Sequence, residues 1–149
     1  RKQIWGGKVP GVVHISEMIS LALHSMAFIA NSEKDIVNVK EISAATGCSE
    51  AHLVKVLQRL VQAGFLYSVR GPKGGFGLAM EPEGITLLDI YQVFESSPAM
   101  AGCPTHHRRC PFNSCIFGGV PEKLNRDFLD YLSQKKVSDF CYPRESSSD

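Results

Sequence analysis

Three cysteines stand close together in the segment 103–115 and offer a set of ligands for a metal centre. Cys103, Cys110 and Cys115 are separated by six and four residues, in a stretch that also holds proline, histidine and arginine. Thiolates are the soft ligands that iron–sulfur clusters and zinc require, and a loop that proline keeps out of regular helix can wrap them around one centre. Two arginines between the first two cysteines favour the thiolate form and balance the charge of a cluster. The spacing predicts a bound metal, with an iron–sulfur cluster slightly favoured over zinc.

Other uses of these thiols stay open on spacing alone. Zinc would be held by the three thiolates together with His106 or His107, although cysteines paired two residues apart are more usual for zinc. Alternatively, two of the thiols form a regulatory disulfide, or all three have no role. The odd total of five cysteines, without a secretory signal pattern, argues against a disulfide framework. Of the remaining two, we expect Cys48 to be a small buried apolar residue, and we assign Cys141 no role.

A second group with chemical potential is a basic, glycine-rich turn at 70–75. It carries Arg70 and Lys73 on a turn whose glycines, Gly74 among them, have no side chain to keep a duplex backbone at a distance. No helix begins after the turn, so it does not match a nucleotide-binding loop. The flanking segments 65–70 and 76–80 are typical of strands. Together they predict a β-hairpin that contacts DNA phosphates.

Two helices joined by a tight turn precede this hairpin. The first is expected over 39–46, where Gly47 ends it, and the second over 50–63, with Ser49 as its N-cap. This order is typical of a winged helix-turn-helix, and the second helix carries a polar stripe on the side away from the core. The stripe consists of Ser49, His52, Lys55 and Arg59. We predict that these side chains meet base edges and phosphates.

Further helices complete the predicted architecture. The first helix is expected from about 15 to 31, and others over 86–94 and from 121 to about 135. The apolar face of the first helix is formed by Ile15, Ile19, Ala22, Met26 and Ile29. The predicted fold is mainly α with a small β-hairpin wing: a winged helix-turn-helix followed by a long C-terminal helix. We divide the chain into a DNA-binding domain at 15–95, a cysteine-rich loop at 96–119, a helical segment at 120–141 and a tail at 142–149 that we expect to be disordered.

Composition and charge limit the classes of function. The 149-residue chain has a net charge of +1, but residues 39–77 carry five cations against two acidic side chains, whereas residues 80–100 carry four acidic side chains and no cation. One face is therefore suited to phosphate. The longest apolar stretch is interrupted by polar residues and lacks the pattern of a signal peptide, so we expect a cytoplasmic protein without a membrane segment. No catalytic constellation or cofactor fingerprint can be named, so we expect neither an enzyme nor a small-molecule substrate.

The hairpin and its surroundings resemble a known family. The sequence Ser-Val-Arg-Gly-Pro-Lys-Gly-Gly-Phe at 68–76 resembles the wing signature of the Rrf2 family of bacterial transcription regulators. Residues 23–30 resemble the first helix of that family, and residues 85–95 resemble the segment after its wing. The likeness covers roughly 15–140. It implies a homodimer that is built on the long C-terminal helix and reads a palindromic operator in double-stranded DNA.

The resemblance also carries over residue by residue. It implies that Arg70 enters the minor groove and that recognition-helix contacts come from Ser49, His52 and Lys55. Val54 is a departure, because some members carry a glutamate there that discriminates between bases. The DNA sequence that those members prefer therefore does not transfer to this chain.

Iron–sulfur binding becomes the favoured use of the loop, since members of the family carry three cysteines in it. The resemblance implies a 2Fe–2S or 4Fe–4S cluster on Cys103, Cys110 and Cys115. The histidine that serves some members as fourth ligand corresponds to Gly118, and an aspartate used by others corresponds to Ser20, so neither ligand is present. A histidine used by another member corresponds to His24, which is our first choice. Behind it rank His106, His107 and Glu17.

The sequence thus predicts a DNA-binding regulator whose operator affinity is controlled by an iron–sulfur cluster that senses redox conditions, nitric oxide or iron. In this hypothesis the cluster joins the loop to the first helix, across subunits, and sets the spacing of the two recognition helices. Two alternatives remain: the same fold acting as a thiol–disulfide or zinc switch, and a winged helix that binds a protein partner instead of DNA.

Overall fold

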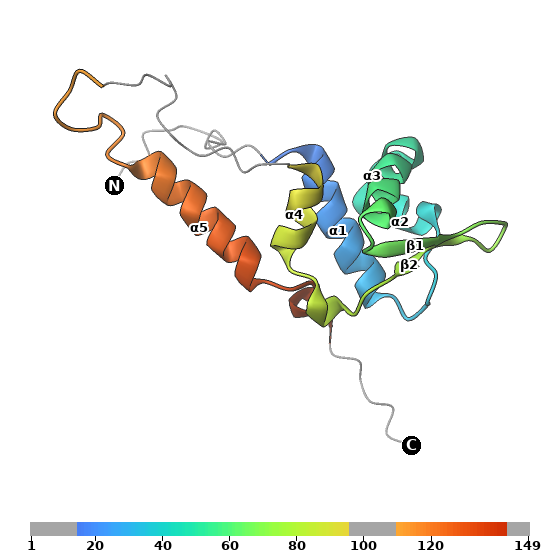
Figure 1. Ribbon diagram of the computed structural model, residues 1–149. Coiled ribbons are helices and arrows are strands. Elements are labelled where there is room, and N and C mark those ends of the chain that lie inside the picture. The colour runs from blue at the N-terminus through green and yellow to red at the C-terminus, as the bar shows by residue number, and fades with distance from the viewer. Residues whose placement is uncertain (1–14, 96–109, 143–149) are drawn as a thin grey trace, which may run out of the picture.

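The computed structural model describes residues 15–95 and 110–142, and shows a helical body with a β-hairpin projecting from one side and a long helix from the other (Figure 1). In chain order the elements are α1 (Glu17–Asn31), α2 (Val39–Thr46), α3 (Glu50–Gln62), β1 (Leu66–Val69), β2 (Gly75–Leu78), η1 (Pro82–Gly84), α4 (Leu87–Phe94), α5 (Val120–Gln134) and η2 (Val137–Phe140). The predicted fold class is confirmed. Within the described ranges, no helix has the length and apolar character needed to cross a membrane.

One hydrophobic core joins the helices of the body. Met26 of α1, Ile42 of α2, Leu57 of α3 and Ile90 of α4 are all fully buried in it. Burying a side chain of this size is worth roughly 1.5–3 kcal/mol relative to leaving it in water, so these contacts fix how the helices cross. The core therefore holds α3, the second helix of the helix-turn-helix, in a fixed position against α1 and α4.

The predicted apolar face of the first helix is confirmed except at its start. Ile19, Ala22, Met26 and Ile29 are buried, but Ile15 is 48% exposed. The reason is local: Ser16 is the N-cap of α1, and its hydroxyl accepts a hydrogen bond from Ile19 N at 3.2 Å. Ile15 therefore lies outside the helix and off its apolar stripe.

The turn between α2 and α3 is fixed by capping at both ends. Asn38 and Glu41 form a capping box at the start of α2, and Gly47 ends the helix in the left-handed conformation, with φ of 72°. The Ser43 hydroxyl then donates a hydrogen bond to the Cys48 carbonyl at 2.6 Å. Cys48, two residues before the start of α3, thus has a defined backbone position, although it lies in a turn.

The hairpin pairs Leu66–Val69 with Gly75–Leu78 in antiparallel register, so the second strand begins one residue earlier than predicted and ends two earlier. Val37, just before α2, joins it through backbone hydrogen bonds of 2.9 and 2.8 Å with Phe76. Gly75 lies directly beneath this bridge, where a Cβ atom would sit 2.2 Å from the Val37 carbonyl oxygen. The hairpin is therefore anchored to the helix-turn-helix through β2, whereas its turn and residues 67–69 of β1 are exposed to solvent.

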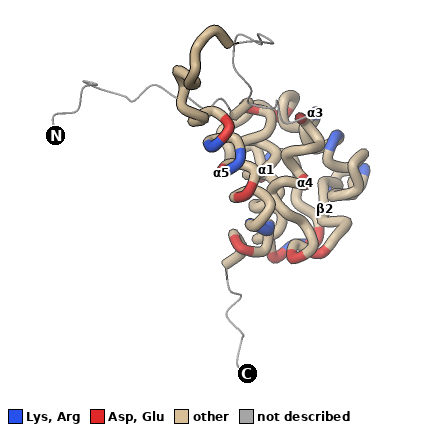
Figure 2. Tube along the Cα trace, turned by 60° about the vertical axis from the view of Figure 1, so that its left-hand side comes forward, with Lys and Arg blue, Asp and Glu red and all other residues tan. Residues whose placement is uncertain are grey.

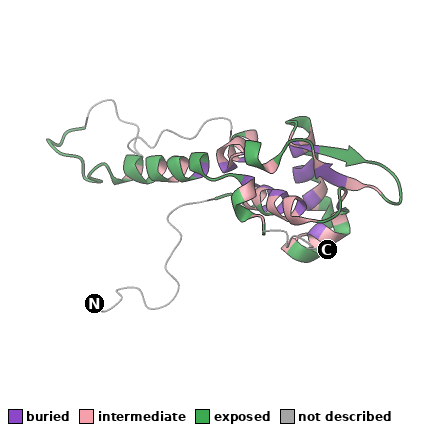
Figure 3. Cartoon of the chain, turned by 90° about the horizontal axis from the view of Figure 1, so that it is seen from below, coloured by how far each residue is buried: buried purple, intermediate pink, exposed green. Residues whose placement is uncertain are grey.

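Helix α5 touches the body along one narrow side. Leu132 is its buried residue, and the Phe128 ring packs edge-to-face on Tyr91 of α4 with centroids 5.8 Å apart. Most of the remaining surface of α5 is exposed (Figure 3), including the apolar side chains of Val120, Leu124 and Tyr131. A helix with this much exposed apolar surface is typical of an interface.

After α5 the chain returns to the body. Val137 N donates to the Ile85 carbonyl at 2.9 Å, and the Asn31 side chain at the end of α1 bonds to Phe140 and Tyr142, at 2.8 and 2.7 Å. These bonds fix the base of α5. The predicted disordered tail, 142–149, lies outside the described residues except for Tyr142.

Candidate DNA interface and cysteine loop

The face of α3 that was predicted to read DNA is accessible at its N-terminal half. Ser49 is the N-cap, and its hydroxyl accepts a hydrogen bond from His52 N at 3.3 Å. Ser49 and Lys55 are exposed, whereas His52 is half-buried. The first turn of α3 therefore presents a hydroxyl, an imidazole and an ammonium group on one side, with unpaired helix N–H groups nearby that favour phosphate.

Arg59, the fourth member of the predicted stripe, is used within the chain. Its guanidinium donates to the Val93 carbonyl at 2.8 Å and to the Met18 sulfur at 3.4 Å, and lies 4.6 Å from the centre of the Phe94 ring. These contacts tie α3 to the end of α4 and to α1. The structure thus gives Arg59 a role in holding the recognition helix, which helical spacing alone did not reveal.

The turn of the hairpin presents both of its cations to solvent. Arg70 and Lys73 are exposed, and neither has a salt bridge to any residue in the described ranges. Gly74 leaves no room for a side chain, because a Cβ atom there would lie 2.2 Å from the Val69 carbonyl oxygen. In Figure 2 basic segments mark the edge next to α3 and β2, while acidic segments gather along the lower edge. The charge separation seen in the sequence therefore becomes a separation in space.

The cysteine loop is described only in part. Cys103 and the alternative ligands His106 and His107 lie outside the described residues, while Cys110 and Cys115 are both exposed. The described portion stands at the outer end of α5, well away from α1 (Figures 1 and 3). Within one chain, the described cysteines of the loop and His24 do not form a cluster of ligand atoms.

His24 is arranged as metal-binding histidines commonly are. It is exposed on α1, and its Nδ1 lies 2.6 Å from the Ser20 carbonyl oxygen, an arrangement that leaves Nε2 as the ring nitrogen available to a metal. It lines a hollow of about 940 Å³ between α1 and the turn that precedes α3, together with Ser20, Thr46 and Cys48. An incoming loop would find an open approach to Nε2 here.

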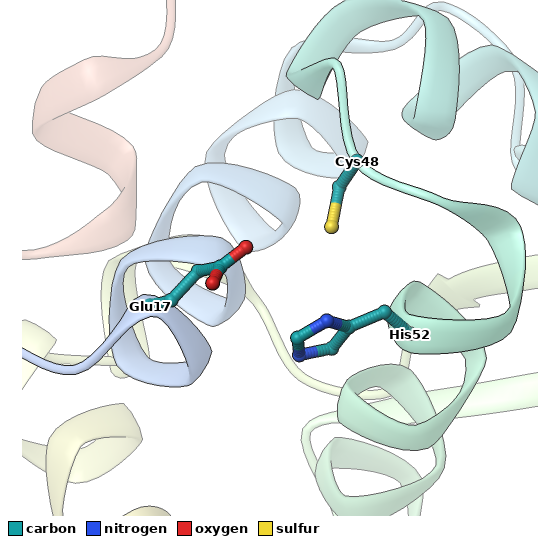
Figure 4. A group of neighbouring side chains, drawn as sticks. All are labelled: Glu17, Cys48 and His52. Carbon is teal, nitrogen blue, oxygen red and sulfur yellow. The ribbon is translucent and has the colours of Figure 1, made fainter.

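One group of ligand atoms was not anticipated. The carboxylate of Glu17, the sulfur of Cys48 and the imidazole of His52 lie within 4.8 Å of one another (Figure 4). Cys48 was expected to be a plain buried residue, and it is only half-buried. The spacing of four residues between Cys48 and His52 was a usable signal, but Glu17 comes from a different helix and only the tertiary structure brings it near.

Comparison with known proteins gives a consistent result. The profile of the Rrf2 family, described as iron-dependent transcriptional regulator, matches residues 15–143. A helix-turn-helix-type transcriptional regulator of Aquifex aeolicus is 32% identical over 127 residues, which are 83% of this chain and 88% of the relative. The regulator NsrR of Bacillus subtilis is 29% identical over 116 residues, 75% of this chain and 77% of that one.

Solved structures show the same fold. CymR, the global cysteine regulator of B. subtilis, superposes with a TM-score of 0.71 at 23% identity, over 86% of this chain and 95% of that one. IscR of T. potens superposes with a TM-score of 0.64 at 26% identity, over 86% and 85%. These relatives are transcription regulators and not enzymes, as the sequence predicted.

Proposed function

This chain belongs to the Rrf2 family of transcription regulators, and from that premise we propose that it is a homodimer whose affinity for a palindromic operator is set by an iron–sulfur cluster. The observation that most directly supports DNA binding is the position of the wing. Arg70 and Lys73 are exposed on a hairpin that is anchored beside the recognition helix. A cytoplasmic location is part of this proposal, because a regulator that binds operator DNA must reach it there.

The DNA contacts divide by position. Ser49, His52 and Lys55 stand on the first turns of α3, where a major groove admits a helix and its N-terminal residues meet base edges. Arg70 at the hairpin turn is suited to the minor groove, where arginine is attracted to the strong negative potential. Lys73 and the backbone at Gly74 are suited to phosphate. Arg59 supports these groups from behind through α4.

Dimerisation is supported by the exposed side of α5. Val120, Leu124 and Tyr131 recur at helical spacing, and Ile116 and Phe117 extend the apolar surface beyond the helix start. A second copy of α5 covers such a stripe by pairing with it, because a twofold interface uses the same patch twice. The dimer also sets the distance between two recognition helices, which must match the spacing of two half-sites.

The donor set of the loop fits a cluster. Cys110 and Cys115 have thiols that face solvent, Cys103 adds a third by sequence, and the family profile is described as iron-dependent. His24 is the fourth ligand we propose, supplied by α1 of the partner copy, since the described residues 110–119 of the loop stand away from α1 of the same chain. When bound, the cluster supplies a centre that oxidation, nitric oxide or iron shortage alters.

The positions of these groups would couple the state of the cluster to DNA affinity. His24 is on α1, which packs directly against α3, and the loop leads straight into α5. A bond between the loop of one copy and α1 of the other therefore restrains the angle between the two DNA-binding bodies. Losing it changes the spacing of the recognition helices and hence operator affinity.

The test begins with protein purified without oxygen. We expect visible absorbance, with iron and sulfide in equal amounts, and DNA binding that falls steeply as salt rises. The triple variant Cys103→Ser, Cys110→Ser, Cys115→Ser should lose colour and iron, and His24→Ala should make the cluster more labile. Cys141→Ser, outside the loop, is the matched control and should keep both. Colourless wild-type protein without iron would refute the cluster.

A thiol switch is the second candidate, because Cys110 and Cys115 are free and exposed and thus accessible to oxidants. In that case purified protein holds no iron, and oxidation changes DNA affinity through a disulfide that mass spectrometry locates. Zinc on the same thiols would appear in metal analysis as one zinc per chain and no absorbance.

A further inference from the structure

We infer that the chain has a second metal site, for a thiophilic divalent cation such as Zn²⁺, on Glu17, Cys48 and His52. The three side chains converge from the start of α1, from the turn before α3 and from the first turn of α3 (Figure 4). The site is separate from the cysteine loop and uses none of its thiols. Its effect on DNA, argued below, rests on the proposed function, whereas metal binding itself does not.

The donor atoms suit zinc in kind and in charge. A thiolate, a neutral imidazole and a carboxylate are all ligands that zinc takes, and the two negative charges balance a divalent cation. Three protein ligands leave a fourth position for water, which the exposed Glu17 side of the group admits. Harder cations such as Mg²⁺ prefer an all-oxygen shell and are disfavoured by the sulfur.

The atoms are almost at binding distance before any metal enters. Their mutual separations stay within 4.8 Å, whereas ligand atoms around a tetrahedral zinc stand about 3.5 Å apart. Because Glu17 is exposed, rotation of its side chain can bring the carboxylate closer to the other two donor atoms. Among the described residues, none of the three side chains has a hydrogen bond or a salt bridge that would have to be broken first.

The backbone around the site is already fixed. The Ser43 hydroxyl holds the Cys48 carbonyl at 2.6 Å, and Ser49 caps α3 through His52 N. Glu17 stands in the first turn of α1, next to its own N-cap, Ser16. Each ligand therefore comes from a capped helix end, so little conformational entropy is lost when the metal binds. Glu17 and Cys48 also line the hollow of about 940 Å³ through which a cation arrives.

The site shares one residue with the proposed DNA interface. His52 belongs to the stripe on α3 that faces the major groove, yet its ring nitrogen is one of the three donors. A bound cation holds the imidazole toward α1 and removes it from the groove. The proposed homodimer would lose this contact in each half-site, so we expect Zn²⁺ to weaken operator binding by about tenfold or more.

The experiment uses the full chain with Cys103, Cys110 and Cys115 changed to serine, so that the loop carries no metal. Co²⁺ serves as the probe, because thiolate bound to it gives an intense charge-transfer absorption and a tetrahedral site gives visible bands. We expect saturation at one Co²⁺ per chain and loss of the bands when Zn²⁺ is added. Operator affinity is then measured with and without Zn²⁺, on a duplex selected from random sequences.

Single variants in this background assign the ligands. Cys48→Ser should abolish the thiolate absorption, and His52→Gln and Glu17→Gln should each weaken Co²⁺ binding at least tenfold. Cys141→Ser and Glu33→Gln are the controls for the remaining thiol and for an exposed carboxylate of the same body, and both should bind Co²⁺ as the background does. Glu17→Gln is at an exposed helix start, so it remains informative if a substitution at Cys48 unfolds the chain.

The outcomes separate the two proposals. No thiolate absorption in the background, or absorption that survives Cys48→Ser, refutes the site. Binding of Co²⁺ with DNA affinity that Zn²⁺ leaves unchanged refutes the competition at His52. If the wild-type loop holds no cluster, the proposed function is corrected while this site is unaffected, because the background lacks the loop thiols from the start.

Discussion

Helix α1 of the body and the α5 arm are both 15 residues long, but the two parts of the protein are stabilised differently. In the body every helix buries its apolar stripe against another element, and Leu53, Leu57 and Leu60 of α3 are completely removed from water. In α5 only Leu132 is buried, and apolar side chains such as Leu124 remain in solvent. The apolar stripes of the body are covered, whereas the arm leaves apolar side chains exposed, which is the surface that the proposed dimer would cover.

The candidate DNA contacts and the candidate cluster ligands also lie in different parts of the protein. The candidate DNA groups stand on the body, where the core and Arg59 fix their positions. The candidate cluster ligands of the loop stand on the arm, where the described residues 110–119 are exposed throughout. A sensor placed on the less constrained part can move relative to the DNA-reading part, and this is what a regulated affinity requires.

The largest expected effect comes from truncating one leucine in each region. Leu57→Ala removes a fully buried side chain from the body and should lower the free energy of unfolding by about 2–5 kcal/mol. Leu124→Ala on the arm, where the side chain is 45% exposed, should cost below about 1 kcal/mol in the monomer. Urea unfolding at several protein concentrations measures both. If both variants lose the same free energy of unfolding at a concentration where the chain is monomeric, the proposed difference between the body and the arm is wrong.

The hairpin anchor should give the next largest effect. Gly75→Ala adds a Cβ that meets the Val37 carbonyl oxygen, at a φ of 157° that side chains rarely adopt. We expect a loss of roughly 2 kcal/mol and weaker DNA binding, since the wing shifts against α3. Gly84→Ala, where nothing stands within 4 Å, is the matched control and should be close to neutral. A neutral Gly75→Ala would mean that the bridge to Val37 is not needed.

A smaller effect, of opposite sign, is expected from a buried hydroxyl in the body. Ser25 of α1 is fully buried, and its Oγ has no hydrogen-bond partner among the described residues. Ser25→Ala should therefore stabilise the chain, by up to about 1 kcal/mol, because an unsatisfied polar group is removed from the core. Ser133→Ala on exposed α5 should change the free energy of unfolding much less. Thermal unfolding compares the two, and destabilisation by Ser25→Ala would show that the hydroxyl is satisfied after all.

The smallest effect is a pH dependence at the start of α2. The salt bridge with Lys34 and the backbone N–H of Asn38 hold the pKa of Glu41 below its usual value of 4.5. A lowered pKa means that the ionised form stabilises the fold above the unfolded pKa, and that this contribution disappears as pH falls through the folded pKa. Glu41→Gln should therefore be slightly less stable than the wild type at pH 7, and the difference should disappear as pH falls below about 4.5. The free energy of unfolding of both proteins is measured between pH 2 and pH 7 by urea unfolding. The same dependence on pH in the variant and the wild type would show that Glu41 does not contribute to it.

The helix-turn-helix and the wing could be predicted from sequence because their determinants are local. Asn38, Gly47 and Ser49 mark helix ends through bonds to neighbouring backbone groups, and the turn glycines specify a hairpin. Arg59 is the instructive exception. Its place in a polar stripe predicted a DNA contact, which stays a prediction. The contacts of its guanidinium with Val93, Met18 and Phe94 could not be predicted, because those residues come from other helices.

The sequence by itself determined the elements, the winged-helix class and the thiols available for a centre, because helix caps, apolar periodicity and residue type act over a few positions. Tertiary structure alone decided which distant groups meet. It placed the exposed side chain of Arg59 against α1 and α4 and left one side of α5 uncovered. It also brought Glu17 beside Cys48 and His52, since the crossing of α1 over the turn before α3 depends on the packing of the whole core and not on any local spacing.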